Sequence, residues 1–97
     1  MKFVQMIEMR TSRYDDLVTL ANEWDKATEG VNTVTRELVT SDRDRPNTYV
    51  MIVEFDSYED AQKNNELPAT NEISAKMAEL CDEPPVFRNL DLIERRH

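Results

Sequence analysis

The sequence is poor in the residues that most often perform chemistry: one cysteine and one histidine among 97 residues. A lone cysteine, Cys81, excludes a disulfide within the chain, and together with a lone histidine it cannot supply the usual ligand set of a zinc site. His97 is the last residue, where chains usually fray. With no histidine to activate it, we expect Cys81 to be a small packing residue rather than a nucleophile.

Positive charge and long apolar runs are also scarce. Lysine and arginine number 12 against 20 aspartates and glutamates, which gives a net charge of −8. Such a surface is repelled by nucleic acids and by anionic membranes, so we expect neither as a partner. No stretch approaches the length of a membrane span, and residues 1–6 lack the apolar segment of a signal peptide. We therefore expect a cytoplasmic protein in a reducing compartment.

Length and composition indicate one folded domain over residues 1–97. The hydrophobic fraction is 39% and the charged fraction 33%, which is typical of a globular chain and not of a disordered one. The sequence contains no repeat and no linker.

Four segments rich in β-branched and aromatic residues predict strands, at residues 2–10, 32–40, 48–55 and 86–93. A polar turn, residues 41–47, joins the second and third strands into a hairpin.

Between the strands, the spacing of apolar residues predicts three helices. The first begins at Ser12, with Asp15 three residues later as in a capping box, and ends near Gly30, which suits a left-handed C-terminal cap. The second begins in the same way at Ser57 and is cut short by Pro68, which can serve as the first residue of the third helix.

This order of elements, β-α-β-β-α-α-β, predicts the fold class. Strand–helix–strand crossovers are right-handed almost without exception, so all the helices should lie on one face of one sheet. We predict an α+β protein of the ferredoxin-like βαββαβ type with its second helix split, built on a four-stranded antiparallel sheet.

The strands are apolar on both sides, which predicts a partner. In the strand 48–55, Tyr49, Met51, Val53 and Phe55 alternate with Val50 and Ile52, so both faces are apolar. Helices cover only one face, and an exposed apolar face usually marks an interface. We expect a homodimer formed sheet to sheet under two-fold symmetry, a dimeric α+β barrel. The alternative is that strand propensity alone placed apolar residues on a wet face.

Polar residues interrupt the apolar stripes of two strands. Gln5 lies between Phe3 and Ile7, and Arg36 lies between Val34 and Leu38. A buried polar group is costly unless it is paired. These residues therefore either pair with carboxylates such as Glu8, Glu37 or Glu54, or project into a cavity that holds a small aromatic or ketone-bearing ligand.

Three short segments resemble a known family: the opening Met1-Lys2-Phe3, the strand Tyr49–Phe55 that ends in Glu and an aromatic residue, and Ser57-Tyr58-Glu59-Asp60-Ala61 at the start of a helix. With the order of elements, they make the chain similar to the dimeric α+β barrel superfamily, and within it to the antibiotic-biosynthesis monooxygenase-like proteins. The resemblance spans nearly the whole chain.

The resemblance implies a cofactor-independent oxygenase or isomerase that acts on a small aromatic or quinol-type substrate between sheet and helices. By this resemblance Arg36 would bind an enolate or phenolate, and Tyr49 and Asn65 would orient it. From the residues themselves, Gln5, which interrupts an apolar stripe, and Trp24 are candidates for contact with the substrate. The simpler interpretation of Trp24 is a packing residue of the first helix. The alternative function is a non-catalytic small-molecule-binding or dimerisation module.

The haem-degrading branch of the superfamily is not matched. It uses an asparagine on the first strand, a tryptophan on the second helix and a histidine on the third. The corresponding places here hold Ile7, Asn64 or Asn65, and Ile73 or Ser74. None of these is an axial haem ligand, so we expect neither haem nor any other cofactor.

Overall fold

The computed structural model describes residues 1–97 and contains four strands and three helices. In chain order they are β1 (Phe3–Arg10), α1 (Tyr14–Ala27), β2 (Val34–Ser41), β3 (Thr48–Phe55), α2 (Tyr58–Glu66), α3 (Pro68–Leu80) and β4 (Val86–Asp91). The strands form one antiparallel sheet in the order β2-β3-β1-β4. This confirms the predicted ferredoxin-like α+β class. None of the helices has the length and apolar content that crossing a bilayer requires.

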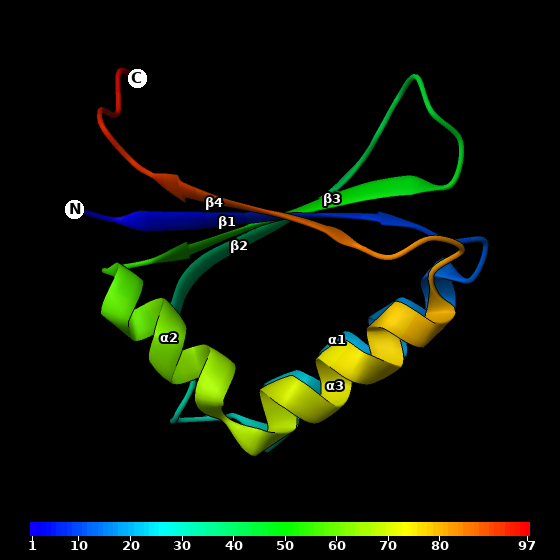
Figure 1. Ribbon diagram of the computed structural model, residues 1–97, viewed down its shortest axis with the longest axis horizontal. Coiled ribbons are helices and arrows are strands. Elements are labelled where there is room, and N and C mark those ends of the chain that lie inside the picture. The colour runs from blue at the N-terminus through cyan, green and yellow to red at the C-terminus, as the bar shows by residue number, and fades with distance from the viewer.

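All three helices lie on one side of the sheet, and the other side is open (Figure 1). The helices α2 and α3 form a V whose arms reach toward opposite ends of the sheet and whose apex lies farthest from it. The apex is at Leu67, which has extended backbone angles (φ −64°, ψ 130°), followed by Pro68 at the start of α3. Because proline cannot donate to the preceding turn, α2 ends there and the chain changes direction.

The register of β1 against β3 decides which side chains face the helices. Gln5 pairs with Val53 and Ile7 with Met51, and both pairs lie on the helix side. By the two-residue period of a strand, the pair of Met6 with Ile52 faces the open side. Both faces of the central strands are apolar, as the alternation predicted.

A β-bulge in β2 changes the side that its residues face. Val34 pairs with Phe55, and Arg36 pairs with the next residue, Glu54, so β2 contains one extra residue at this point. A bulge of this kind reverses the alternation beyond it. Arg36 therefore shares the open face with Glu54, and Glu37 turns toward the helices. Simple alternation would have put Arg36 on the same side as Val34.

The core is small and lies mainly under α2. Phe3, Val53, Phe55 and Ala61 form one buried cluster, in which Phe55 is only 1% exposed. The rings of Phe3 and Phe55 pack with their centroids 6.2 Å apart. A second contact region lies toward the other end of β1, where Met9 is buried. Between these regions the helix layer stands away from the sheet.

The helix starts agree with the sequence prediction at two places and differ at one. Ser57 caps α2, its side chain accepting a 3.1 Å hydrogen bond from the Asp60 N–H, and Pro68 opens α3. The prediction that Ser12 caps α1 is wrong, because the N-cap is Arg13 and no side chain caps it. Instead, the fully buried Thr11 hydroxyl accepts from the Arg13 N–H and donates to the Leu80 carbonyl, which joins β1, α1 and α3.

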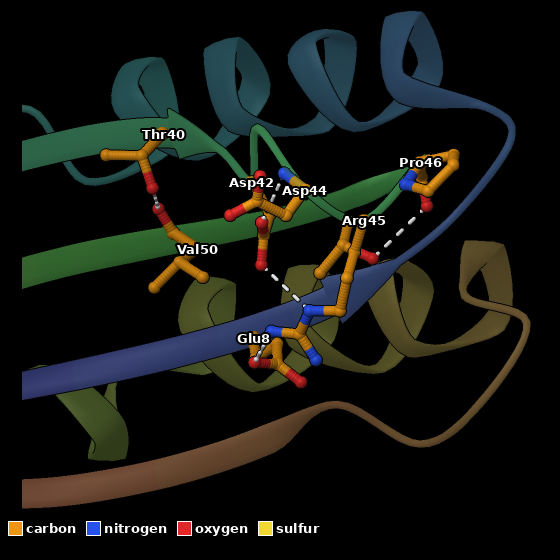
Figure 2. A network of polar contacts seen from close by, with 8 residues as sticks. Glu8, Thr40, Asp42, Asp44, Arg45, Pro46 and Val50 are labelled. Atoms are coloured by element: carbon orange, nitrogen blue, oxygen red, sulfur yellow. Dashed lines mark hydrogen bonds and ion pairs between the residues drawn. The ribbon is translucent and has the colours of Figure 1, made fainter.

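The turn between β2 and β3 is held by internal polar contacts (Figure 2). Asp42 accepts hydrogen bonds from the Asp44 N–H at 2.9 Å and from Arg45 Nε at 2.8 Å. The same arginine reaches Glu8 on β1 at 3.0 Å, and its guanidinium holds the pKa of Asp42 below the usual range. Asn47 completes the turn with a positive φ of 57°, a conformation that asparagine tolerates well.

The two predicted caps allow a matched test of stability. We expect Ser57→Ala to lower the free energy of unfolding by about 1 kcal/mol, because it removes the hydrogen bond to the Asp60 N–H. Ser12→Ala, which removes an exposed serine that caps nothing, should change it by less than about 0.5 kcal/mol. Urea unfolding followed by circular dichroism measures both. Equal losses for the two variants would contradict the assignment of the caps.

Candidate functional site

A cavity of about 290 Å³ lies between the helices and the sheet. All seven elements contribute to its 18 lining residues, ten of which are hydrophobic. An apolar concave site with a few polar groups is the usual form of a small-molecule site. The polar lining residues are Gln5, Asp25, Glu37, Asn64, Asn65, Thr70, Asn71 and Ser74.

The cavity lies between the sheet and the two arms of the V formed by α2 and α3. Asn64 and Asn65 come from the last turns of α2, and Thr70 and Ile73 come from the first turns of α3, on either side of the apex. The break at Leu67 therefore turns the ends of two helices toward one volume.

One wall of the cavity is an indole held in a fixed orientation. Trp24, from α1, donates a 2.8 Å hydrogen bond from its Nε1 to the Thr70 hydroxyl of α3. Both residues line the cavity. Because the bond fixes the indole against a second helix, its ring offers a preset face on which an aromatic ligand can stack.

Asn64 carries a buried acceptor that nothing satisfies. The residue is 6% exposed, lines the cavity, and its side-chain Oδ1 has no hydrogen-bond partner. An unpaired buried acceptor costs about 1–3 kcal/mol. Such a group inside a cavity is a natural contact for a ligand O–H or N–H.

Two carboxylates, Glu37 of β2 and Asp25 of α1, are the only ionisable side chains in the lining. Partial burial raises the pKa of Glu37 above its ordinary value, and the neighbouring negative charge of Asp25 raises it further. No lysine, arginine or histidine lines the cavity. The site is thus largely apolar, with amides and hydroxyls that can donate or accept hydrogen bonds, two carboxylates and no positive charge.

The structure brings together three of the five site residues expected from the sequence. Gln5, Trp24 and Asn65 line the cavity. Arg36 and Tyr49 do not. The bulge puts Arg36 on the open face, where its Nη1 lies 3.5 Å from Oε2 of the buried Glu54. This ion pair is the structural alternative that the sequence left open.

Tyr49 faces the helices but lies near one end of the sheet, beyond the cavity. Its ring stacks on Tyr14 at the start of α1, with the centroids 4.5 Å apart. The tyrosine therefore packs the first turn of α1 against β3 and does not touch the cavity.

Sequence reasoning missed Glu37, Asp25 and Asn64. The position of Glu37 depends on the bulge, which alternation does not reveal. Asn64 could have been found, because it lies three residues after Ala61 and thus on the same face of α2, and both are buried.

Other reactive residues lie outside the site. The Cys81 thiol donates to the Met77 carbonyl at 3.3 Å, and burial raises its pKa, with a further contribution from Asp82. A protonated, hydrogen-bonded thiol is a poor nucleophile. No three His, Cys, Asp or Glu side chains are grouped so that they could hold a metal ion.

Comparison with solved structures identifies the fold. A candidate antibiotic biosynthesis monooxygenase from Caulobacter crescentus superimposes with a TM-score of 0.82 at 10% identity, over 96% of this chain and 91% of that chain. SnoaB, a cofactor-independent oxygenase from Streptomyces nogalater, gives 0.82 at 9% identity, over 97% and 95%. A candidate antibiotic biosynthesis monooxygenase from Chloroflexus aurantiacus gives 0.76 at 15% identity, over 100% and 98%. The fold is that of the antibiotic biosynthesis monooxygenase-like proteins, as the resemblance implied.

The sequence itself gives no closer match. No protein-family model matches the chain, and a search of curated proteins finds no relative. At these identities the likeness establishes the fold, whereas substrate and activity depend on the cavity.

The unsatisfied acceptor of Asn64 gives a prediction about stability. We expect Asn64→Leu, which keeps the size of the side chain, to raise the free energy of unfolding by about 1 kcal/mol, because it removes a buried, unpaired polar group. Asn65→Leu at the exposed neighbouring position should change it by less than about 0.5 kcal/mol. Thermal unfolding of both variants at one pH measures the difference. A clear loss of stability in Asn64→Leu would show that the amide is satisfied in solution.

Proposed function

We propose that the chain is a cofactor-independent oxygenase that acts on a small aromatic or quinol-type substrate in the cavity under α2 and α3. The observation that carries the proposal is the cavity itself: an apolar volume with an oriented indole and one buried, unpaired amide acceptor, in a fold shared with a cofactor-independent oxygenase. Its volume is at the lower end for small-molecule sites, which suits a compact aromatic ligand.

The chemistry needs little from the protein beyond binding and deprotonation. An electron-rich aromatic CH₂ or C–OH group loses a proton, and the resulting anion transfers electrons to O₂. For a CH₂ group, the reaction with O₂ gives C=O and H₂O, so the substrate supplies all the electrons. The protein contributes acceptors that orient the reacting group, and apolar walls that exclude water.

Within this proposal, Trp24 stacks on the substrate, while Asn65 and Gln5 contact its polar groups. A base for the proton is available in Glu37, whose raised pKa brings it nearer to neutrality. The proposal gives no catalytic role to Arg36 or Tyr49, because neither contacts the cavity.

We further propose that a second copy of the chain covers the open face of the sheet. That face carries Val4, Met6, Val50 and Ile52 at its centre, with Leu38, Val86 and Leu90 between 39% and 48% exposed. The β2–β3 turn and the C-terminal tail rise past this face at opposite ends, so a second sheet could lie between them (Figure 1). Arg95 of the tail already binds Glu54 on this face at 2.8 Å.

A second candidate function is a binding module without catalysis. It is favoured by the lining, which contains no histidine, cysteine or lysine and only two partly exposed carboxylates as ionisable groups. Native mass spectrometry that finds a retained small molecule, together with no oxygen uptake on any substrate, would support this alternative.

Oxygen uptake with a panel of quinols and anthrones tests the oxygenase. We expect Trp24→Ala and Asn65→Ala to lower kcat/KM by about tenfold or more, because each removes a contact with the bound substrate. Tyr49→Phe, a matched aromatic variant outside the cavity, should stay within about twofold of the parent protein. Absence of uptake across the panel would exclude the proposed activity, and a tenfold loss in Tyr49→Phe would exclude the proposed site.

The proposed dimer is tested by a charge on the open face. We expect the parent protein to sediment as a dimer at micromolar concentration and Ile52→Asp to sediment as a monomer, because an unpaired carboxylate would be buried between the sheets. Asp56→Asn, at an exposed position beyond the end of β3, serves as control and should remain a dimer. A parent protein that sediments as a monomer would refute the proposal.

A further inference from the structure

The hydrogen-bonding character of the cavity restricts what it can bind. Its buried amide oxygen, Asn64 Oδ1, has no partner, and its only charged groups are the carboxylates of Glu37 and Asp25. Lysine, arginine and histidine are missing from the lining. A ligand carboxylate or phosphate could accept hydrogen bonds from the amides and hydroxyls of the lining, but it would be repelled by two negative charges with no cation to offset them.

A ligand with donors reverses each of these penalties. An O–H or N–H placed against Asn64 would satisfy an acceptor that is otherwise desolvated without compensation. A positive group near Glu37 would offset the repulsion between that carboxylate and Asp25. The net charge of −8 adds a long-range attraction for cations.

We propose that the cavity selects an aromatic ligand that bears a hydrogen-bond donor, held by Asn64 Oδ1, and a protonated amino group, held by Glu37 with Asp25 beside it. The inference rests on the proposed function in taking this cavity as the substrate site, and it narrows the substrate class to phenols that carry an aminoalkyl group. Trp24 supplies the stacking surface for the ring.

Four probes of similar shape test each part of the proposal. Tyramine carries a phenol and an ammonium group, para-propylphenol replaces the ammonium by a methyl group, and para-hydroxyphenylpropionate replaces it by a carboxylate. Phenethylamine keeps the ammonium and lacks the hydroxyl. Calorimetric titration in low-salt buffer gives the affinities, and the fluorescence of Trp24, the only tryptophan, shows whether the probe enters this cavity.

We expect tyramine to bind about tenfold more tightly than para-hydroxyphenylpropionate, with para-propylphenol between them. Glu37→Gln, which keeps the shape and removes the charge, should bring tyramine and para-propylphenol within about twofold of each other. Asn64→Leu should weaken tyramine by about fivefold and leave phenethylamine unchanged, because only tyramine donates an O–H to this position.

Lowering the pH gives an independent readout. As Glu37 is protonated, the affinity for tyramine should fall while that for para-propylphenol stays constant. Asp25 on α1 is the only other titratable group in the lining, and the cavity residues of α2 and α3 are uncharged at every pH in this range. Asp25→Asn should therefore reduce the preference for tyramine only in part.

The proposal is overturned if the anionic probe binds as tightly as tyramine, if Glu37→Gln keeps the preference for the cation, or if no probe binds at millimolar concentration. These outcomes are separate from those of the oxygenase test. Binding in the expected order without oxygen uptake would leave the ligand class intact and remove the activity. Oxygen uptake that is equal for cationic, neutral and anionic substrates would leave the oxygenase activity intact and remove the proposed ligand class.

Discussion

The break between α2 and α3 at Leu67–Pro68 is the constraint on which the site depends. The break directs α2 and α3 toward opposite ends of the sheet and leaves a space between their arms and the sheet. Because the two arms meet the sheet at its ends, the core is divided, with the Phe3, Phe55 and Ala61 cluster at one end and Met9 at the other. The cavity is what remains between them, and its polar residues come from the helix turns on both sides of the break.

A second feature, the bulge in β2, determines which charged side chain faces that cavity. Without the extra residue, Arg36 would have continued on the side of Val34, and the lining would carry a cation. With it, Glu37 points inward and Arg36 pairs with Glu54 on the opposite face. One inserted residue therefore changes the charge that β2 contributes to the cavity from positive to negative, and with it the class of ligand that the cavity can hold.

The sequence predicted the fold well because its signals are local. The continuous apolar strand 48–55 was placed to the residue, and the serine before α2 and the proline that opens α3 act directly on the neighbouring backbone. The site was predicted less completely: the interrupted apolar stripe indicated Gln5, the family resemblance indicated Asn65, and Trp24 was mainly interpreted as a packing residue, whereas the position of Glu37 depends on the bulge in β2. Thr11 was missed for a similar reason, because its partner carbonyl at Leu80 is distant in sequence.

The bulge has a second consequence, for how sheets of this kind associate. β2 is an outer strand of the sheet, with most of its side chains exposed, and a regular outer strand can recruit a strand from another molecule. The extra residue at Thr35 interrupts the row of free backbone groups, and the charges of Arg36 and Glu37 follow immediately. Addition of a foreign strand is thereby disfavoured at this end of β2, and the exposed charges that follow the bulge act in the same direction.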